Sequence, residues 1–469
     1  IRALGLKGVI LASTSRAVYP EPLAGPVLGF VDWADHGQYG LEQQYDRKLI
    51  GRDGSQMIYL DTANRPLPVG VQKPRPPIAG ASLVLTLDSR IQAVVERRLA
   101  AAVRRYGAES GTAIVMDPHT GAILAMASLP SFDPNHYNRV TDPNRFANLA
   151  LQNYQPGSTF KLIGVAAGLD SGAFTPQTTI YDPGYYQHYG ITVHNWQVGA
   201  GWGVETPALM LRHSANVGMA QFADMMGPST FYRYVVTRFG FNAPTGIGLG
   251  ESSGYVRTPF NGANWQMEDL LTNSYGQGID VTPLQLVTAF AAMANGGWRM
   301  QPYIVKSIIY PQELHRAPLV VQPRRVVRAV SAATAATMRD VLLEASNSVQ
   351  AETVCAETNN YPTVVKTGTA TIEGPSAHGL DLTHGTTASL IGYAPANDPK
   401  FVMLVTLRHP QPGPDGQGIY GAVAAAPAWH DIALSLYRIM GITPQIGSTP
   451  DQLGLWQGPQ GWNCGFVPQ

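Results

Sequence analysis

Hydrophobic residues recur along this chain with two different periods, and each period predicts a different kind of element. Short apolar runs bounded by turn-forming residues are typical of strands. Thr112–Met116 and Ala122–Ala127 flank the turn-forming segment Asp117–Gly121, which predicts a hairpin. Ala388–Tyr393 and Phe401–Leu407 flank a segment with two prolines, an asparagine and an aspartate, which predicts a second hairpin near the C-terminus.

Apolar residues at helical spacing dominate the region between the two hairpins. A helix is also expected before the first hairpin, at Arg90–Arg105, because Ile91, Val95 and Leu99 fall on one face. The helical stretches expected between the hairpins are residues 158–169, 206–225, 229–238, 282–295 and 331–346. Strands on both sides of a helical middle predict an α+β fold, in which helices flank a central antiparallel sheet whose strands are discontinuous in sequence.

The N-terminal part of the chain has shorter elements and a different composition. A strand is expected at Val27–Phe30 and a helix at Leu41–Leu49, and the following residues 65–80 contain five prolines, typical of a stiff connector. We therefore place a domain boundary after this connector and expect a small mixed α/β module before it. The predicted division is residues 1–80, residues 81–442 and a Gly/Pro-rich C-terminal tail at residues 443–469.

Composition narrows the functional class without identifying it. Apolar residues make up 45% of the 469 residues, which excludes global disorder, and 32 basic against 32 acidic residues give no net charge. A nucleic-acid partner is not expected, because such a partner requires a cationic surface. Cys355 and Cys464 form no C-x-x-C pair and the histidines form no H-E-x-x-H motif, so we expect no metal site and no cofactor.

Three short motifs could carry chemistry, and the first is Ser158-Thr159-Phe160-Lys161. Residues three apart share a helix face, so the Lys161 amine can reach the Ser158 hydroxyl, and the start of a helix favours negative charge on that oxygen. A serine becomes a nucleophile only with a base beside it, and lysine can serve where burial or a second cation keeps it neutral. Alone, the motif is also compatible with a capping serine beside a surface lysine.

The second and third motifs are Ser214-Ala215-Asn216 and Lys366-Thr367-Gly368-Thr369. Taken singly, the second is compatible with helix capping and the third with a polar strand end. On a strand, Lys366 and Gly368 should face one side and the two threonines the other. The chain has only seven lysines, and two of them occupy motif positions. S-x-x-K, S-x-N and K-T-G in this order are the motif set of penicillin-binding proteins and serine β-lactamases.

With these motifs the chain resembles the class B penicillin-binding proteins, the monofunctional peptidoglycan D,D-transpeptidases. The resemblance extends to Val27–Phe30 and Gly40–Gly51, which look like the N-terminal pedestal of class B enzymes, and to Asp117–Met126 and Gly276–Gln285 in the transpeptidase domain. It covers essentially residues 7–440. It implies a β-lactamase/transpeptidase-like domain preceded by a dimerisation-type pedestal that does not bind penicillin.

The resemblance implies a role for the residues of the first two motifs. Ser158 would attack the penultimate D-Ala carbonyl of a stem peptide, form an acyl-enzyme and release the terminal D-Ala. Lys161 would accept the Ser158 proton, and Ser214 would relay it toward the leaving amine. Asn216 would hold Lys161 and the substrate amide.

The resemblance implies roles for the third motif as well. Lys366 would raise the local positive potential and so favour a neutral Lys161. The Thr367 and Thr369 hydroxyls would bind the substrate carboxylate, and Gly368 would let the substrate approach the strand closely. The backbone N–H groups of Ser158 and Thr369 would form the oxyanion hole.

The resemblance also implies partners and a location. The partners would be peptidoglycan stem peptides, β-lactam antibiotics, a membrane-embedded glycan polymerase and other cell-wall assembly proteins. The chain starts at Ile1 rather than at a methionine, and no run of 18 apolar residues occurs in it. We therefore expect a processed or truncated fragment, whose N-terminal transmembrane anchor precedes Ile1 and places the enzyme at the extracytoplasmic face of the membrane.

Two other functional classes remain open. A D,D-carboxypeptidase or β-lactamase has the same motifs, although no base for rapid deacylation by water can be identified in the sequence. A non-catalytic β-lactam sensor or divisome scaffold could also keep them. The segment Gly250–Gly254 matches G-x-S-x-G, but it lacks the flanking strand and helix of a nucleophile elbow, so we expect a loop.

Two further features each allow two interpretations. The aromatic residues between the first two motifs could line a groove near the site or could serve packing: Tyr185, Tyr186, Tyr189, Trp196 and Trp202. Cys355 and Cys464 could form a disulfide in an extracytoplasmic domain or could remain two thiols.

Overall fold

The computed structural model describes residues 17–59, 61–63, 65, 67, 74–197, 199–260, 264–346, 361–371, 385–412 and 419–443. The chain divides into two compact units. The first consists of Ile1–Val84, Ser131–Phe146 and Ser307–Val320, and the second of Leu85–Pro130, Ala147–Lys306 and Val321–Gln469. The division into residues 1–80, 81–442 and 443–469 remains a prediction, and most of the proposed tail lies outside the described residues.

The first unit is built from short elements. Helix α1 (Gly25–Leu28) precedes a ribbon of β1 (Phe30–Val31) and β2 (Gly37–Gln38), and α2 (Gly40–Leu49) follows. The 3₁₀ turns η2 and η3, at Pro134–Arg139 and Pro143–Phe146, come from a later part of the chain. Aromatic rings from both parts pack together, and Phe30 stacks on Tyr137 with their centroids 4.1 Å apart. A sheet in the order β12 (Leu319–Val320), β11 (Val305–Ile309), β3 (Ser82–Leu85) falls largely in this unit.

The strand expected at Val27–Phe30 is wrong over most of its length. Pro26 lies in the first turn of α1, where its missing N–H costs no hydrogen bond. Gly29 adopts φ 81° and ends the helix, so only Phe30 lies in a strand. The helix expected at Leu41–Leu49 is confirmed as α2.

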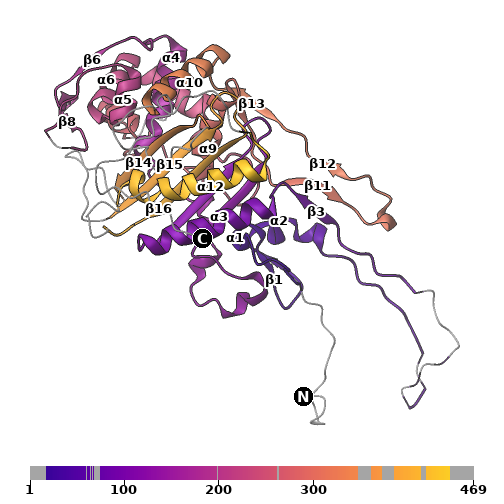
Figure 1. Ribbon diagram of the computed structural model, residues 1–469. Helices are drawn as coiled ribbons and strands as arrows, with labels where there is room; N and C mark the ends of the chain where they lie inside the picture. Colours follow the sequence, from indigo (N-terminus) through magenta and orange to yellow (C-terminus); the bar gives the residue numbers. More distant parts are fainter. Residues whose placement is uncertain are drawn as a thin grey trace. The chain divides into compact units, whose positions relative to one another are not determined.

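A five-stranded antiparallel sheet organises the second unit (Figure 1). The strand order is β14 (Val364–Thr371), β15 (Thr386–Ala394), β16 (Phe401–Arg408), β4 (Ser110–Met116), β5 (Ile123–Leu129). Both expected hairpins are present as β4–β5 and β15–β16, and β16 pairs with β4 to join them. The prediction of a central antiparallel sheet with strands discontinuous in sequence is therefore confirmed.

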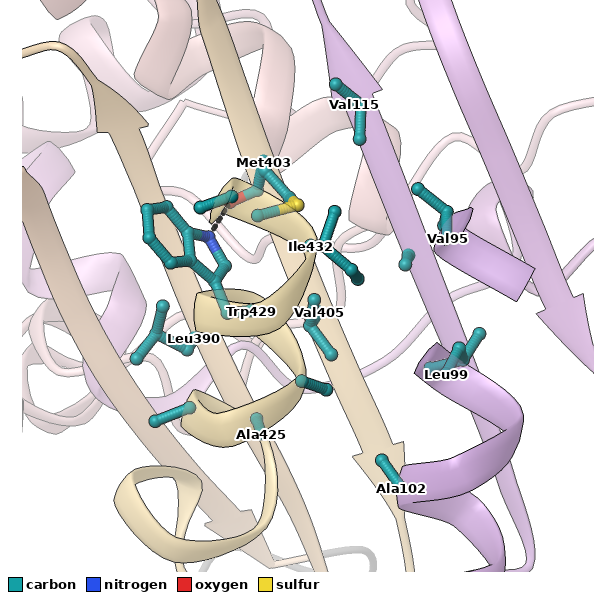
Figure 2. Packing of buried hydrophobic residues seen from close by; sticks show 14 of the residues in the cluster. Val95, Leu99, Ala102, Val115, Leu390, Met403, Val405, Ala425, Trp429 and Ile432 are labelled. Atoms are coloured by element: carbon teal, nitrogen blue, oxygen red, sulfur yellow. Dashed lines mark hydrogen bonds between the residues drawn. The ribbon is translucent and has the colours of Figure 1, made fainter. Parts of the chain in front are cut away.

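The main core lies between one face of this sheet and two helices, α3 (Ser89–Arg105) and α12 (Ala426–Ile439). Figure 2 shows Leu99 of α3 and Ile432 of α12 beside Val405 of the sheet. Trp429 is completely buried, and its indole N–H donates to the Met403 carbonyl at 3.0 Å, so the ring is packed without losing a hydrogen bond. The helix expected at Arg90–Arg105 is confirmed as α3, whereas α12 was not predicted.

The opposite face of the sheet is covered by helices from the middle of the chain. Helix α9 (Pro283–Ala294) packs there through Phe290, whose ring centroid lies 5.4 Å from that of Tyr393. Its start is fixed by a capping box, in which Thr282 Oγ1 accepts from the Gln285 N–H at 3.0 Å. The other helices of this middle region are α4 (Lys161–Ser171), α5 (Pro207–His213), α6 (Asn216–Met226), α7 (Pro228–Arg233), α8 (Met267–Ser274) and α10 (Ala332–Ser346).

The single helix expected over residues 206–225 is wrong, because the structure has two helices there. Helix α5 ends at Ser214, which adopts the left-handed conformation with φ 53° and ψ 35°. After Ala215, α6 begins at Asn216. The second motif therefore spans the turn between two helices, with Ser214 at the end of α5 and Asn216 as the first residue of α6.

The remaining predictions for this region are confirmed with small differences at the ends. The helix expected at 158–169 begins as a 3₁₀ turn, η5 (Gly157–Phe160), and the one at 229–238 ends in a π turn, η6 (Tyr234–Arg238). The helices at 282–295 and 331–346 are α9 and α10. Smaller elements are β6 (Ile180–Asp182), β7 (Tyr185–His188), β8 (Ile191–His194), β9 (Gly203–Glu205), β10 (Trp298–Met300), β13 (Arg325–Arg328), η4 (Leu149–Leu151), η7 (Gln312–Leu314) and α11 (Gly421–Ala424).

Candidate active site

Ser158 lies in a tight turn at the start of a buried helix. The turn η5 passes directly into α4, so Ser158 is one turn before the α-helical geometry begins. Gly157 adopts φ 55°, and its N–H donates to the Gly276 carbonyl at 3.1 Å. A Cβ atom on Gly276 would clash with the Gly157 carbonyl, so this backbone approach requires glycine. The Gly276 segment, which contributed to the family resemblance, therefore supports the turn that carries Ser158.

The Lys161 side chain is completely buried beside Ser158. Its Nζ lies 3.0 Å from Ser158 Oγ and 2.8 Å from Asn216 Oδ1, and it also donates to the Ser214 carbonyl. Removing an amine from water is costly unless its hydrogen bonds are replaced. Here polar atoms of the first and second motifs replace them, which fixes the amine against the serine hydroxyl.

Ser214 lies between the two motif lysines. Lys366 Nζ donates to Ser214 Oγ at 2.8 Å, and Lys161 Nζ is 3.4 Å from the same oxygen. The left-handed backbone at Ser214 makes this possible, because its carbonyl and its hydroxyl can both reach the lysines. Lys366 also donates to the Thr367 carbonyl at 2.9 Å and is only 4% exposed. A single hydroxyl thus connects two buried amines.

The third motif lies on β14, which is an edge strand of the sheet. Lys366 and Gly368 face the first two motifs: Lys366 contacts Ser214, and a Cβ atom on Gly368 would lie 2.9 Å from Thr159 Cγ2. Thr369 faces the other way, and its Oγ1 accepts from the Gly421 N–H at 3.2 Å. The alternation expected for this strand is confirmed for these three residues.

Two asparagines, Asn216 at the start of α6 and Asn195 directly after β8, connect the Ser214 turn to the end of β8. Asn216 Nδ2 donates to the His194 carbonyl at 3.2 Å. Asn195 Oδ1 accepts from the Val217 N–H at 3.1 Å, and its Nδ2 donates to Asp182 Oδ2 at 2.7 Å. The start of α6 is therefore capped by a neighbouring segment, since Ala215 provides no side-chain cap.

Sequence analysis did not identify a buried carboxylate beside this turn. Glu205 at the end of β9 is completely buried, and His213, next to Ser214, lies with Nδ1 2.9 Å from Glu205 Oε1. Burial raises the pKa of the Glu205 carboxyl, and the hydrogen bond from His213 opposes that rise. The only sequence signal was the position of His213 directly before the motif serine, and nothing in the sequence pointed to Glu205.

Four of the five aromatic residues named between the first two motifs fall into two groups, and the fifth, Tyr185, is exposed. Trp196 Nε1 donates to the His213 carbonyl at 3.2 Å, and Trp202 stacks on the His213 ring, so both lie beside the Ser214 turn. The hydroxyls of Tyr186 and Tyr189 donate to Asp224 on α6 at 2.9 and 2.6 Å. The two tyrosines therefore fit the packing interpretation, whereas the position of the two tryptophans beside the Ser214 turn is compatible with both interpretations.

Other candidate sites give a mixed outcome. The segment Gly250–Gly254 contains no helix, as expected, and Glu251 in it accepts from Thr245. Cys355 and Cys464 lie outside the described residues, so the disulfide remains a hypothesis. In the part of the chain that the structure describes, no three His, Cys, Asp or Glu side chains are arranged to hold a metal ion, and no helix has the length and apolar character to cross a membrane.

Comparisons with known proteins agree with this arrangement. Residues 111–432 match the family model described as penicillin binding protein transpeptidase domain. Stage V sporulation protein D of Bacillus subtilis is 34% identical over 452 residues, which cover 95% of this chain and 67% of that protein. Peptidoglycan D,D-transpeptidase FtsI of Escherichia coli is 30% identical over 454 residues, covering 96% of this chain and 72% of that protein.

A solved structure shows the same fold. Penicillin binding protein 3 of Mycobacterium tuberculosis, complexed with ampicillin, matches with a TM-score of 0.79 and 30% sequence identity over 93% of this chain and 94% of that one. The central antiparallel sheet flanked by helices is therefore the transpeptidase fold. The chain belongs to the penicillin-binding protein transpeptidase family and, within it, to the class B enzymes, the serine-type peptidoglycan D,D-transpeptidases.

Proposed function

We propose that this protein cross-links peptidoglycan stem peptides through an acyl-enzyme on Ser158, with release of D-Ala, and that β-lactams acylate the same oxygen. The observation that carries the proposal is the chain of contacts from Ser158 Oγ through Lys161 Nζ and Ser214 Oγ to Lys366 Nζ. This chain links a nucleophile, a base, a relay and a cation in one largely buried site.

The contacts of Lys161 suit a general base. The Ser214 carbonyl and Asn216 Oδ1 can only accept hydrogen bonds, so both N–H bonds of a neutral amine can point at them. The lone pair then faces the hydroxyl of Ser158, 3.0 Å away. Lys161 takes the Ser158 proton as Oγ attacks the penultimate D-Ala carbonyl.

Ser214 returns that proton to the leaving group. Its hydroxyl can accept from one lysine while donating to the departing amine of the terminal D-Ala. Lys366 holds the hydroxyl at 2.8 Å, and its charge favours a neutral Lys161. Asn216 holds Lys161 through Oδ1 and, in this proposal, also holds the substrate amide.

Strand β14 and the Ser158 turn bind the substrate. The backbone N–H groups of Ser158 and Thr369 form the oxyanion hole, and preorganised donors of this kind are commonly the largest single contribution to catalysis. The Thr367 and Thr369 hydroxyls bind the terminal carboxylate, near the charge of Lys366. Gly368, whose missing side chain leaves β14 close to Thr159, allows the peptide to lie along the strand.

The setting follows from the reaction. The stem peptides and the acceptor amine belong to peptidoglycan outside the cytoplasm, so the enzyme acts at the extracytoplasmic face of the membrane, held by an N-terminal transmembrane anchor. It works with a membrane-embedded glycan polymerase and other cell-wall assembly proteins. The first unit serves as the pedestal for these partners, and the second carries the reaction.

A fluorescent penicillin tests the acyl-enzyme directly. We expect stoichiometric labelling of the wild-type protein that persists for hours and no labelling of Ser158→Ala. The matched control is Ser171→Ala, at the other end of α4, where the hydroxyl only donates to the Gly168 carbonyl; this variant should label like the wild type. Labelling of Ser158→Ala would overturn the proposal, and a label lost within seconds would identify a β-lactamase instead.

A further inference from the structure

A carboxylate–histidine pair lies next to the Ser214 turn, outside all three motifs. Glu205 is completely buried, and the His213 side chain is 16% exposed. The 2.9 Å contact between Glu205 Oε1 and His213 Nδ1 fits a proton carried on Nδ1 and donated to the carboxylate. Two ionisable groups are thus held in the protein interior by each other.

His213 is fixed on several sides and is bonded covalently to the turn. Its ring stacks on Trp202 with centroids 4.2 Å apart and planes 10° apart. Its carbonyl accepts from Trp196 Nε1 at 3.2 Å. The next residue is Ser214, whose left-handed backbone sets the position of the carbonyl and hydroxyl that contact the lysines. The His213 side chain and carbonyl are thus anchored one residue before the turn that contacts both lysines.

Glu205 also faces the first turn of α6, where Asn216 contacts Lys161. Glu205 Oε2 has no hydrogen-bond partner among the described residues, and a Cβ atom on Gly218 would lie 2.7 Å from it. Glycine at this position therefore leaves the space that the carboxylate fills. The charged groups that act on Glu205 are Asp182, His213 and Lys161, and Lys161 is the base assigned above.

We propose that Glu205 and His213 are positioning residues for acyl transfer: through His213 the carboxylate holds the Ser214 turn against both lysines, and its charge acts on Lys161. The inference rests on the proposed function, since it concerns the rate at which Ser158 is acylated. The Glu205 carboxylate is buried, and only one of its two oxygens has a hydrogen-bond partner among the described residues. Burying a carboxylate in this way costs free energy. A neutral side chain could support the fold at this position without that cost.

Acylation kinetics with a fluorescent penicillin test this role in three variants and one control. His213→Ala should lower the acylation rate constant roughly 10- to 100-fold, as loss of a hydrogen bond to a charged group does, without a comparable change in the half-saturating concentration. His213→Gln, whose amide can still donate to Glu205, should recover part of that loss. Glu205→Gln keeps an acceptor for His213 but removes the charge.

The Glu205→Gln variant distinguishes an effect of the Glu205 charge on Lys161 from a role of Glu205 in supporting the fold, because only the former changes the pH dependence of acylation. Loss of the negative charge removes a counter-charge for protonated Lys161, so the acid limb of the acylation rate should move to lower pH. The control is Asp224→Asn on the same helix α6, a carboxylate that accepts from Tyr186 and Tyr189 and lies 3.6 Å from His188. It should change neither the rate constant nor the acid limb.

The outcomes distinguish this inference from the proposed function. If wild-type protein acylates at Ser158 and His213→Ala does so at the wild-type rate, the positioning role is wrong while the proposed function stands. The inference is also overturned if the acid limb of the acylation rate does not move in folded Glu205→Gln. The same holds if the acid limb moves by an equal amount in Asp224→Asn. If wild-type protein is not acylated at Ser158, the proposed function itself fails.

Discussion

Two pairs of cationic side chains in the second unit carry the same charge but differ in their exposure to water and in their contacts. Lys161 and Lys366 are 0% and 4% exposed, and their amines are held by atoms of the motifs. Arg325 and Arg328 of β13 are exposed, and their guanidinium groups lie 5.0 and 5.1 Å from the centroid of the Trp298 ring. The lysines are held by several short hydrogen bonds within the protein, whereas the arginines are exposed to water and Arg328 donates one long hydrogen bond, to the Gly296 carbonyl at 3.3 Å.

The comparison of the lysines with the arginines indicates that burial and fixed hydrogen-bond partners, more than charge itself, make a cationic side chain reactive. In the interior an electrostatic interaction is stronger than in water, and an amine with fixed acceptors loses little energy to reorganisation during the reaction. On the surface the same charge is screened by water and salt. We therefore expect substitutions of the lysines to change the acylation rate strongly and substitutions of the arginines to change it little.

The largest effect is expected for Lys161→Met, which keeps the apolar stem and removes the amine. Without a base, acylation by a fluorescent penicillin should slow on the order of 10³-fold. Its second-order rate constant, measured on protein whose melting curve shows it to be folded, checks this. Arg325→Met is the matched control and should acylate at the wild-type rate. A loss of less than tenfold in Lys161→Met would remove the base assignment.

A backbone change at Gly276 should have the next largest effect. In Gly276→Ala the new Cβ collides with the Gly157 carbonyl, so the Ser158 turn must shift, and a displacement near 1 Å costs about 10²-fold in rate. Gly190→Ala is the control, because it has a similar positive φ, 85° against 82°, but nothing lies within 4 Å of the new Cβ. Equal acylation rates in the two variants would contradict a role for the contact between Gly276 and the Ser158 turn.

Lys366→Met should reduce acylation less than Lys161→Met does. It removes one charged hydrogen bond to Ser214 and the charge near the substrate carboxylate, and one such bond is worth roughly 1.5–3 kcal/mol, or about 10- to 100-fold. With a penicillin lacking its carboxylate, the difference between variant and wild type should shrink to the part that comes from the hydrogen bond to Ser214. If that difference is the same for both penicillins, Lys366 does not act on the carboxylate.

The smallest effect is expected at the exposed arginines. Arg325→Ala and Arg328→Ala each remove a cation–π contact with Trp298, which is worth roughly 0.5–1 kcal/mol at an exposed site. Chemical denaturation should show a loss of stability of that size, with acylation unchanged. A tenfold loss of acylation in either variant would contradict the contrast between the two regions.

Much of the fold could be predicted from sequence because local pattern and tertiary environment agree. Strands β4 and β16 are continuous apolar runs with clear turns, and α3 has one apolar face. Helix α12 was missed since its first turns are rich in alanine and proline, and its burial is decided by contacts with the sheet. At α1, Pro26 in the first turn and Gly29 at the C-cap delimit a short helix, where the apolar residues alone indicated a strand.

The site was predictable in its residues but not in its geometry. The three motifs identified Ser158, Lys161, Ser214 and Lys366 by their order along the chain. The left-handed backbone of Ser214 could not be predicted, because Leu211–Gly218 is compatible with a continuous helix and contacts with distant lysines compensate for the break. Glu205 was not identified because its partner His213 is eight residues away across a capped helix start, with no periodicity to connect them.

Transpeptidation through Ser158 can be measured as exchange of the terminal D-Ala of a stem-pentapeptide donor for an added D-amino acid, followed by mass spectrometry. The account predicts that the wild-type protein forms the exchanged peptide with release of D-Ala, that Ser171→Ala does the same, and that Ser158→Ala forms none. Exchange by Ser158→Ala, or release of D-Ala by the wild type with only hydrolysed peptide as product, would contradict it.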